Sequence, residues 1–306
     1  MFRYTNVQRR LMFRNNSDRC VHSPERYGFH GARVHYLSSD GSIQIGLWHI
    51  PPQSDNDLCQ IGIGEDNRVV VMYAHGSGGS RASKHRIALY KLLTKQLGLH
   101  VVTFDYRGFA DSTYVWPTSD GTVHDAAIVY QWILEQGVDP KRIMVWGHSL
   151  GSGIIIRLLS SLSDHQYPFA AILEAPFTTI RDVLQYCSIS RLYNYLPYFE
   201  SCFMDRIVNN PETNYDSISL LDRLRCPLTI LHADNDWMVS QRLGRRLYEI
   251  ATDVQPEHVP RARFHSFPSV HSHSKIVYNP QLANIVADVI HSYCPCDKSK
   301  IELSKS

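Results

Sequence analysis

The sequence has no long apolar run. No stretch approaches the roughly 18 to 20 consecutive apolar residues of a membrane-spanning helix, and the N-terminus lacks the apolar segment of about 7 to 15 residues that marks a signal peptide. Charge of one sign is also scarce, because 31 Lys and Arg face 29 Asp and Glu, which leaves a net charge of +2. So small an excess argues against a nucleic-acid partner. We therefore expect a soluble or peripheral protein.

Cysteines are few and odd in number. The seven are scattered along 306 residues, which does not suggest a disulfide framework in a chain large enough to fold without one. We expect reduced thiols. The sequence also lacks an internal repeat, a low-complexity tract and a domain-separating linker, so a single catalytic domain is the expected organisation.

The composition that is present suits one α/β domain. With 43% hydrophobic and 20% charged residues, the chain can bury a substantial core, and we expect that domain over residues 31–296. Residues 1–30 are polar and aperiodic, which predicts a poorly ordered arm, and residues 297–306 predict a polar tail. The first nineteen residues are basic, with one acid, Asp18, against five arginines: Arg3, Arg9, Arg10, Arg14 and Arg19.

Short apolar runs alternate with helix-like segments through most of the chain. Continuously apolar runs, rather than alternating ones, are typical of parallel strands that are covered on both faces. The pattern predicts a mostly parallel central sheet with helices on both faces, preceded by an antiparallel hairpin. The expected strands are residues 32–36 and 43–49 in the hairpin, then 68–74, 99–104, 143–146, 170–174, 228–232 and about 262–264, and the expected helices are 87–97, 123–136, 149–161 and about 280–293.

The alternation breaks between Pro176 and Arg223. This stretch has no strand signal but contains many aromatic residues, and an insertion of this kind predicts a small helical lid over about residues 177–223. We expect the lid to line an apolar pocket.

A pentapeptide between the fifth expected strand and the helix that follows it points to nucleophilic catalysis. Gly147-His148-Ser149-Leu150-Gly151 fits G-x-S-x-G, directly after an apolar strand and before a helix. In that context a sharp turn presents the serine hydroxyl at the carboxyl end of the sheet, beside a helix N-terminus that favours a developing oxyanion. We therefore predict Ser149 as the nucleophile.

The tetrahedral intermediate of acyl transfer needs two backbone donors on its oxygen. One is the amide after the nucleophile, which is Leu150 here. The other is expected from the glycine-rich loop that follows the strand ending at Ala74, where the amide after Gly76 belongs to Ser77. The alternative is that this loop is only a turn that leaves the strand.

A serine nucleophile needs a histidine base and a carboxylate that holds the histidine in its reactive tautomer. In proteins that carry the serine in such a strand–turn–helix motif of a parallel sheet, the acid follows the serine in sequence and precedes the histidine. Asp236 stands three residues before a valine in the loop after strand 228–232, where the acid is expected, whereas Asp234 lies nearer the strand and is the alternative.

The base is expected in the loop after the last strand. Of the histidines there, His273 lies just ahead of the terminal helix and is the predicted base, with His271 as the alternative. A zinc site would need cysteines or an H-E-x-x-H helix beside this cluster, and the sequence has neither, so no metal and no cofactor are expected.

Several strings spread over residues 30–293 together resemble the α/β-hydrolase-domain lysophosphatidylserine and monoacylglycerol lipases. The resemblance implies the α/β-hydrolase fold, with Ser149 as nucleophile, Asp236 as acid and His273 as base at the family's interval before Pro280. Two positions depart from related hydrolases, which usually have glycine where this chain has Ala110 and proline where it has Ser240. The strings are Tyr73-Ala74-His75-Gly76, Thr103-Phe104-Asp105-Tyr106-Arg107-Gly108-Phe109, Val145-Trp146-Gly147-His148-Ser149-Leu150-Gly151, Glu174-Ala175-Pro176-Phe177-Thr178 and Ile230-Leu231-His232-Ala233.

The resemblance also implies a substrate and a location. These lipases cleave the single acyl ester of lysophosphatidylserine or a monoacylglycerol, and the best-known members reside in the endoplasmic-reticulum membrane through an N-terminal helix. No such helix is found in this sequence, so a cytoplasmic or peripheral location is the alternative, and the basic arm is a candidate for contact with an anionic membrane surface. A protein palmitoyl-thioesterase, a small-molecule carboxylesterase and a non-catalytic lipid-binding relative are the alternative functions.

Overall fold

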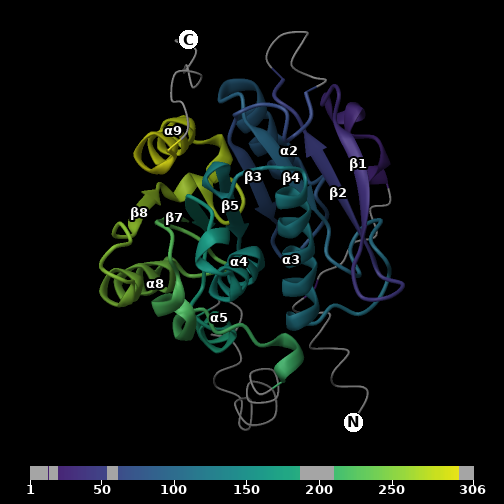
Figure 1. The fold of residues 1–306 in the computed structure, drawn as a ribbon. Coiled ribbons are helices and arrows are strands. Elements are labelled where there is room, and N and C mark those ends of the chain that lie inside the picture. The colour runs from purple at the N-terminus through teal and green to yellow at the C-terminus, as the bar shows by residue number, and fades with distance from the viewer. Residues whose placement is uncertain (1–12, 14–19, 54–60, 187–209, 296–306) are drawn as a thin grey trace.

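The computed structural model describes residue 13 and residues 20–53, 61–186 and 210–295. Within these residues the strands form one eight-stranded sheet in the order β1-β2-β4-β3-β5-β6-β7-β8 (Figure 1). Neighbours from β4 to β8 pair in parallel, while β2 runs antiparallel to both β1 and β4. The predicted mostly parallel sheet with its edge hairpin is confirmed. The strands are β1 (Arg33–Ser38), β2 (Gln44–Ile50), β3 (Val70–Ala74), β4 (His100–Phe104), β5 (Ile143–His148), β6 (Ala170–Glu174), β7 (Leu228–Ala233) and β8 (Arg263–Phe267).

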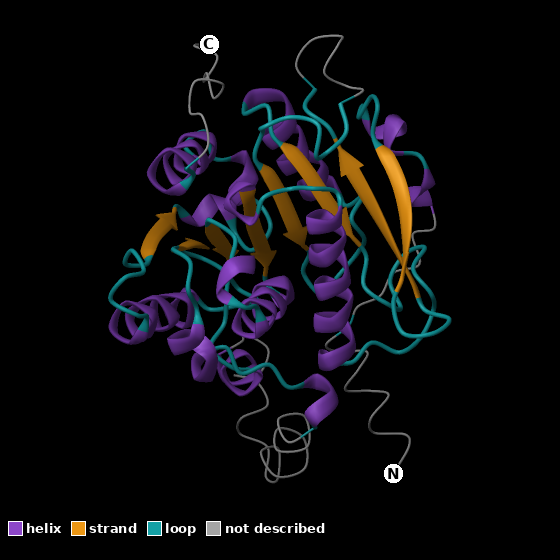
Figure 2. Ribbon diagram, viewed as in Figure 1, coloured by secondary structure: helices purple, strands orange, loops and turns teal. Residues whose placement is uncertain are grey.

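Both faces of the sheet are buried, as the continuous apolar runs predict. Side chains of a strand alternate between its two faces, so Val70 and Met72 of β3 join one core while Val71 and Tyr73 join the other. The first core is completed by α3 (Ser119–Glu135), α4 (Leu150–Ser161) and α8 (Gln241–Val254), and the second by α2 (Lys84–Lys91) and α9 (Leu282–Tyr293) (Figure 2). Each large aliphatic side chain buried in this way contributes about 1.5 to 3 kcal/mol to stability.

The helices differ from the predicted ones at their ends. The hydroxyl oxygen of Thr118 accepts a hydrogen bond from the Gly121 amide, and this N-cap lets α3 begin at Ser119, four residues early. Pro280 lies in the turn before α9 rather than inside its first turn. A π-helical turn, η4 (Leu92–Gln96), continues α2.

Helix α8 is an element that the sequence analysis did not predict. Leu243, Leu247 and Ala251 are buried at a spacing of four residues, which places them on one helical face. Exposed arginines, Arg245 and Arg246, lie between them. This amphipathic spacing was the available signal.

Residues ahead of β1 already pack on the domain. The short 3-10 helices η1 (Cys20–His22) and η2 (Pro24–Tyr27) precede the buried Phe29, and the indole of Trp48 donates a hydrogen bond to the Val21 carbonyl. Phe13 is buried edge-to-face against Phe109. Packing therefore begins before residue 31, where the predicted domain starts, because these apolar side chains fill the core. Residues 1–12 and 14–19 of the arm and the predicted tail 297–306 lie outside the described residues.

The predicted lid, residues 177–223, is described only in part, since residues 187–209 lie outside the described residues. Its described parts hold α5 (Ile180–Tyr186) and the 3-10 helices η8 (Pro211–Thr213) and η9 (Ile218–Arg223). Two of its aromatics, Phe177 and Tyr215, are buried edge-to-face, and the Tyr215 hydroxyl is hydrogen-bonded to Thr122. These two rings are part of the core. The lid as a pocket-lining unit stays a prediction.

The structure also bears on the membrane and cysteine expectations. None of the helices in the described ranges combines the length and apolar character needed to cross a bilayer. Cys226 is a buried free thiol, and Cys294 is buried as well. Burial raises the pKa of Cys226 to about 12, so this thiol stays protonated at neutral pH and is a poor nucleophile.

Candidate active site

Ser149 lies in a strained turn between β5 and α4. Its backbone has φ 51° and ψ −116°, and φ is positive for a residue that is not glycine. The Ser149 amide donates a hydrogen bond to the Glu174 carbonyl at the end of β6, which helps to hold this conformation. Positive φ in a non-glycine residue costs about 1 to 3 kcal/mol and is concentrated at functional sites. The turn therefore has the conformation expected for a presented nucleophile.

The glycines on either side of this turn allow close backbone approach. A Cβ at Gly151 would lie 2.0 Å from the carbonyl oxygen of Ala74, and one at Gly147 would lie 2.5 Å from that of Gly151. Any larger residue would push α4 away from β3 and β5. The G-x-S-x-G spacing is thus a packing requirement for bringing Ser149 to the carboxyl ends of the central strands.

Asp236 and His273 meet beside this turn, although they come from the loops after β7 and β8. His273 Nδ1 lies 2.7 Å from Asp236 Oδ2. The other carboxylate oxygen, Oδ1, accepts hydrogen bonds from the amides of Met238 and Val239, both at 2.9 Å. Ser272, with φ 37°, turns the chain directly before His273. The carboxylate is thereby fixed by its own loop and holds one ring nitrogen of His273.

The environment keeps Asp236 ionised. Burial by itself would raise the pKa of Asp236, but the hydrogen bonds with His232 and His273 outweigh burial and hold that pKa well below its usual value. A carboxylate that stays ionised accepts the Nδ1–H proton of the histidine and leaves Nε2 free to take a proton.

The alternative residues lie in other contacts. Asp234 Oδ1 accepts a hydrogen bond from Gln241 Nε2 at 2.6 Å and one from the Ser266 hydroxyl. His271 is hydrogen-bonded to Asn279 at 2.9 Å. The structure therefore brings together Asp236 and His273 of the four candidates, and neither Asp234 nor His271 contacts that pair through a hydrogen bond.

His148 joins the base loop to the turn that carries the nucleophile. His148 Nε2 donates to the backbone carbonyl of His273 at 3.0 Å, and the two ring centroids are 4.9 Å apart. The hydrogen bonds of the described residues do not include one between Ser149 Oγ and His273 Nε2. Catalytic hydrogen bonds of unliganded enzymes are often long and tighten in the substrate complex.

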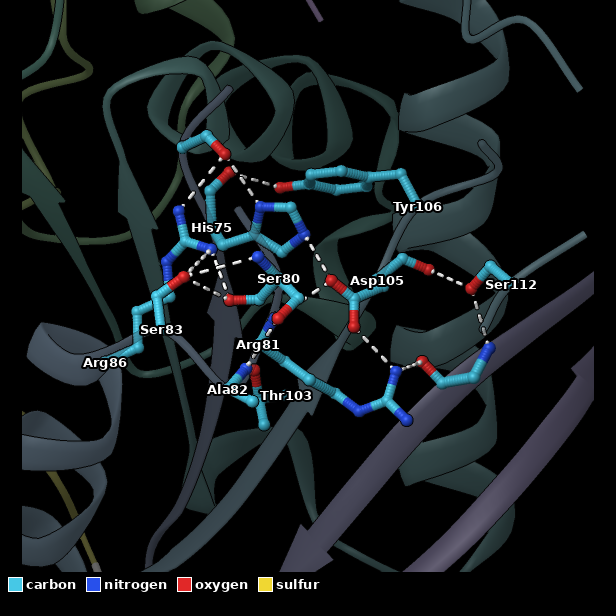
Figure 3. A network of polar contacts seen from close by, with 12 residues as sticks. His75, Ser80, Arg81, Ala82, Ser83, Arg86, Thr103, Asp105, Tyr106 and Ser112 are labelled. Atoms are coloured by element: carbon cyan, nitrogen blue, oxygen red, sulfur yellow. Dashed lines mark hydrogen bonds and ion pairs between the residues drawn. The ribbon is translucent and has the colours of Figure 1, made fainter. Parts of the chain in front are cut away.

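Two predicted oxyanion donors flank Ser149. The Leu150 amide is at the first position of α4, where backbone N–H groups have no helical partner. The loop with Ser77 comes close to Ser149, since a Cβ at Gly76 would lie 3.3 Å from the Cβ of Ser149. Figure 3 shows the polar contacts behind this loop, which include the hydrogen bond from the Tyr106 hydroxyl to the His75 carbonyl at 2.8 Å.

Glu174 is a buried carboxyl that the sequence analysis did not assign to the site. Burial raises the pKa of Glu174 to about 7, and the hydrogen bond from the Trp146 indole, at 3.0 Å, partly opposes that rise. Its carbonyl accepts a hydrogen bond from the Ser149 amide, so the residue lies next to the predicted nucleophile. Its one sequence signal was its position at the end of a buried strand.

In the described part of the chain, no group of three or more His, Cys, Asp or Glu side chains is arranged to hold a metal ion.

The chain is similar in sequence to known α/β hydrolases. A family model described as alpha/beta hydrolase fold matches residues 69–166. The chain is 37% identical over 282 residues to the lysophosphatidylserine lipase ABHD12 of Danio rerio, covering 89% of this chain and 73% of that protein. It is 34% identical to the lysophosphatidylserine lipase ABHD12 of Mus musculus, covering 87% and 69%, and 32% identical to the human Protein ABHD12B, covering 83% and 71%.

Solved structures share the fold at low sequence identity. An esterase of Pyrococcus furiosus superposes with a TM-score of 0.69 at 17% identity and covers 92% of this chain and 98% of that one. An alpha-beta hydrolase of Vibrio vulnificus gives a TM-score of 0.67 at 16% identity, with 95% and 93% covered. At such identities the likeness concerns the fold alone.

Proposed function

The chain belongs to the α/β-hydrolase family of the lysophosphatidylserine lipases, and on that premise we propose that it hydrolyses the acyl ester of single-chain lipids. Lysophosphatidylserine and monoacylglycerols are the proposed substrates. We propose Ser149 as nucleophile, Asp236 as acid, His273 as base, and the amides of Ser77 and Leu150 as oxyanion donors. These roles match the catalytic parts that an acyl-transfer reaction requires.

One observation carries the proposal. His273, held through Nδ1 by Asp236 at 2.7 Å, is docked by its backbone on His148, the residue next to Ser149. A carboxylate, a histidine and a strained serine from three separate loops thus converge at one edge of the sheet. Such convergence has no packing purpose of its own, which supports a catalytic role.

Acylation begins when His273 Nε2 takes the proton of the Ser149 hydroxyl as Oγ attacks the ester carbonyl carbon. The carbonyl oxygen becomes an oxyanion that accepts hydrogen bonds from the Leu150 and Ser77 amides. Collapse of this intermediate breaks the bond to the alcohol oxygen, which receives the proton from His273. Glycerol or glycerophosphoserine leaves, and the fatty acyl group remains on Ser149.

Deacylation repeats the sequence with water. His273 takes a proton from water as the water oxygen attacks the acyl carbon, and the same two amides bind the second oxyanion. The proton then passes from His273 to Ser149 Oγ as the free fatty acid forms. Asp236 stays ionised throughout and stabilises the imidazolium in both steps.

We also propose that the basic arm contacts anionic membrane surface, which would bring the enzyme to lipid substrates. The arm contains Arg3, Arg9 and Arg10 within its first ten residues. Each Lys or Arg near an anionic surface contributes about 1 kcal/mol. Residence at the endoplasmic-reticulum membrane is proposed from the family resemblance, and imaging of the tagged chain with an organelle marker tests it.

Hydrolysis of lysophosphatidylserine and of a monoacylglycerol by the purified chain tests the proposed activity. Ser149→Ala is expected to lower kcat by a factor on the order of 10⁴ or more, because removing the nucleophile of a serine hydrolase removes the covalent route. A fluorophosphonate probe is expected to label the wild-type chain and not the variant.

Ser160→Ala is the matched control on the same helix. The Ser160 hydroxyl donates to the Arg157 carbonyl on α4 and lies a helix length away from Ser149. This variant is expected to keep wild-type activity and labelling. Lipid hydrolysis that survives Ser149→Ala would refute the assignment, and turnover of acylated peptides but not of lipid esters would redirect the substrate to thioesters.

A further inference from the structure

Arg86, in α2, is a buried cation that binds a single loop. Its side chain is almost fully buried, at 2% relative exposure. Its guanidinium donates through Nη1 to the Ser80 carbonyl oxygen at 2.5 Å (Figure 3). Nη2 donates to two more carbonyl oxygens of this loop after β3, those of Gly78 at 2.6 Å and Gly76 at 3.3 Å. Among the described residues, no carboxylate forms an ion pair with Arg86. Peptide dipoles of this one loop therefore compensate its charge.

The neighbouring Arg81 shows what an ordinary buried arginine looks like here. Its guanidinium contacts Asp105 at 2.6 Å (Figure 3). It also contacts Asp111 at 2.6 and 2.7 Å, so two carboxylates neutralise it. A buried charge without an ionic partner is costly, several kcal/mol in proteins, and needs a compensating arrangement of hydrogen bonds. Arg86 differs from Arg81 in that no ion pair of the described residues joins it to a carboxylate, while three carbonyls of the loop that carries Ser77 accept its hydrogen bonds.

The Gly76 carbonyl belongs to the same peptide group as the Ser77 amide. Because that group is planar and trans, the direction of the oxygen fixes the opposite direction of the N–H. The oxygen accepts one hydrogen bond from Arg86 and another from His75 Nδ1, at 2.7 Å. Both donors pull the oxygen to one side, and a donor that is ionised also polarises the peptide it binds.

We infer that Arg86 is a positioning residue for the oxyanion donor of the proposed reaction. It holds the Gly76 carbonyl inward, so that the Ser77 amide is presented to the space beside Ser149. This inference rests on the proposed function, because it assumes that an oxyanion forms on a carbonyl attacked by Ser149. Arg86 itself touches neither substrate nor the reacting atoms.

Two histidines, His75 and His85, lie near this cation. Burial, and after it the positive charge of Arg86, lowers the pKa of His75, and the same two causes lower the pKa of His85 to about 3. The His85 ring is therefore neutral at physiological pH. His75 faces two acceptors, the Gly76 carbonyl through Nδ1 and Asp105 Oδ1, 3.1 Å from Nε2.

Arg86→Met tests the inference, since methionine keeps an unbranched apolar stem and removes the three hydrogen bonds to the loop carbonyls. On a p-nitrophenyl butyrate substrate we expect kcat to fall about 10- to 100-fold, which is less than the 10²- to 10³-fold that follows the outright loss of an oxyanion donor. KM is expected to change less than about threefold, because the amide acts on the transition state rather than on the bound ester.

The decisive readout is an alkyl trifluoromethyl ketone, which adds to a serine nucleophile and forms an oxyanion in the same site. Its affinity is expected to fall by the same factor as kcat, whereas the matched methyl ketone, which forms no stable oxyanion, is expected to bind both proteins equally. A purely structural role for Arg86 would lower thermal stability without this selective loss.

Arg142→Met is the matched control. Arg142 is also buried, and it donates through Nε and Nη2 to the Arg68 carbonyl, but it stands at the start of β5, at the opposite end of the strand from Ser149. It is expected to lower the unfolding temperature and to leave kcat and trifluoromethyl ketone affinity unchanged.

Unchanged kcat and ketone affinity in Arg86→Met, with fluorophosphonate labelling of Ser149 intact, would overturn the positioning role and leave the proposed nucleophile standing. A wild-type chain that is not labelled would instead refute the proposed function. If Arg86→Met does not fold, Arg86→Lys supplies the measurement: a single ammonium cannot reach three carbonyls, so kcat and ketone affinity are expected to fall together, and a fall in neither overturns the inference.

Discussion

The two carboxylate oxygens of Asp236 have different hydrogen-bond partners, and one of them contacts His273. Asp236 Oδ1 is occupied by two backbone amides, and Oδ2 faces His273 Nδ1. In Asp236→Asn the side-chain oxygen must stay with the amides, so the NH₂ group turns to His273 and favours the tautomer with a bare Nδ1. That tautomer carries its proton on Nε2 and cannot accept one from Ser149. We expect kcat to fall about 10³- to 10⁴-fold, measured by ester hydrolysis at neutral pH.

Asp234→Asn is the comparison variant, two residues away. Its carboxylate binds Gln241 and Ser266 at the surface and has no contact with His273. Activity within about twofold of wild type is expected. The opposite ranking of the two variants would make Asp234 the acid.

At the scale of single residues, the sequence limited the candidate acids and bases to a few, but it could not show which of them are in contact. Ser149 could be predicted because its motif is local, five residues that form one turn. The pairing of Asp236 with His273 joins residues 37 apart along the chain, and loop conformations decide it. Arg86 has no motif, and its role follows only from where the Gly76 carbonyl points.

The neighbouring strands β5 and β6 carry a buried, hydrogen-bonded pair, Trp146 and Glu174. Burial raises the pKa of Glu174 from 4.5 to about 7, so between these values the folded protein keeps a proton that the unfolded chain loses. The stabilisation from the protonated carboxyl is complete below pH 4.5 and is lost as pH rises through about 7. A shift of this size corresponds to about 3 kcal/mol at 1.36 kcal/mol per unit.

Glu174→Gln keeps the acceptor for the Trp146 indole and cannot ionise. Compared with wild type, its free energy of unfolding by urea is expected to rise by up to about 3 kcal/mol at pH 8 and to be nearly unchanged at pH 4.5. Glu257→Gln, at an exposed carboxyl, controls for the loss of one surface charge. A difference between Glu174→Gln and wild type that does not depend on pH would contradict the buried-proton account.

Other elements show where sequence patterns were sufficient. The parallel strands were predicted nearly to their ends because fully buried strands have continuous apolar runs. Helix α8 was not predicted, although its buried apolar residues have the spacing of an amphipathic helix. At Ala110 the backbone has φ 44°, the left-handed region that glycine adopts most easily, which explains why related hydrolases have glycine at this position.

At the scale of the whole molecule, the basic arm is the proposed contact with a lipid surface. Replacing Arg3, Arg9 and Arg10 by Gln removes three charges and leaves Phe13, which is buried in the core, untouched. At about 1 kcal/mol for each arginine, binding to phosphatidylserine-containing vesicles is expected to weaken on the order of 10²-fold. Sedimentation of the protein with vesicles measures this.

Two controls separate the arm from the active site. Hydrolysis of p-nitrophenyl butyrate is expected to be the same for the triple variant and wild type, since the substitutions lie outside the proposed catalytic residues. Binding of wild type to anionic vesicles is expected to weaken with salt, because the Debye length falls from about 10 Å at 0.1 M to about 3 Å at 1 M. Equal sedimentation of variant and wild type would remove the arm as the membrane contact.

The sequence by itself determined the fold class, the nucleophile motif and a short list of acids and bases, because each depends on residues that are neighbours in one strand, turn or loop. The tertiary structure decided which acid meets which histidine, that packing begins before residue 31, and that a buried arginine lies behind the oxyanion loop. These depend on contacts between segments far apart in the chain. Their geometry is set by how the loops at the carboxyl edge of the sheet pack together, which no local pattern encodes.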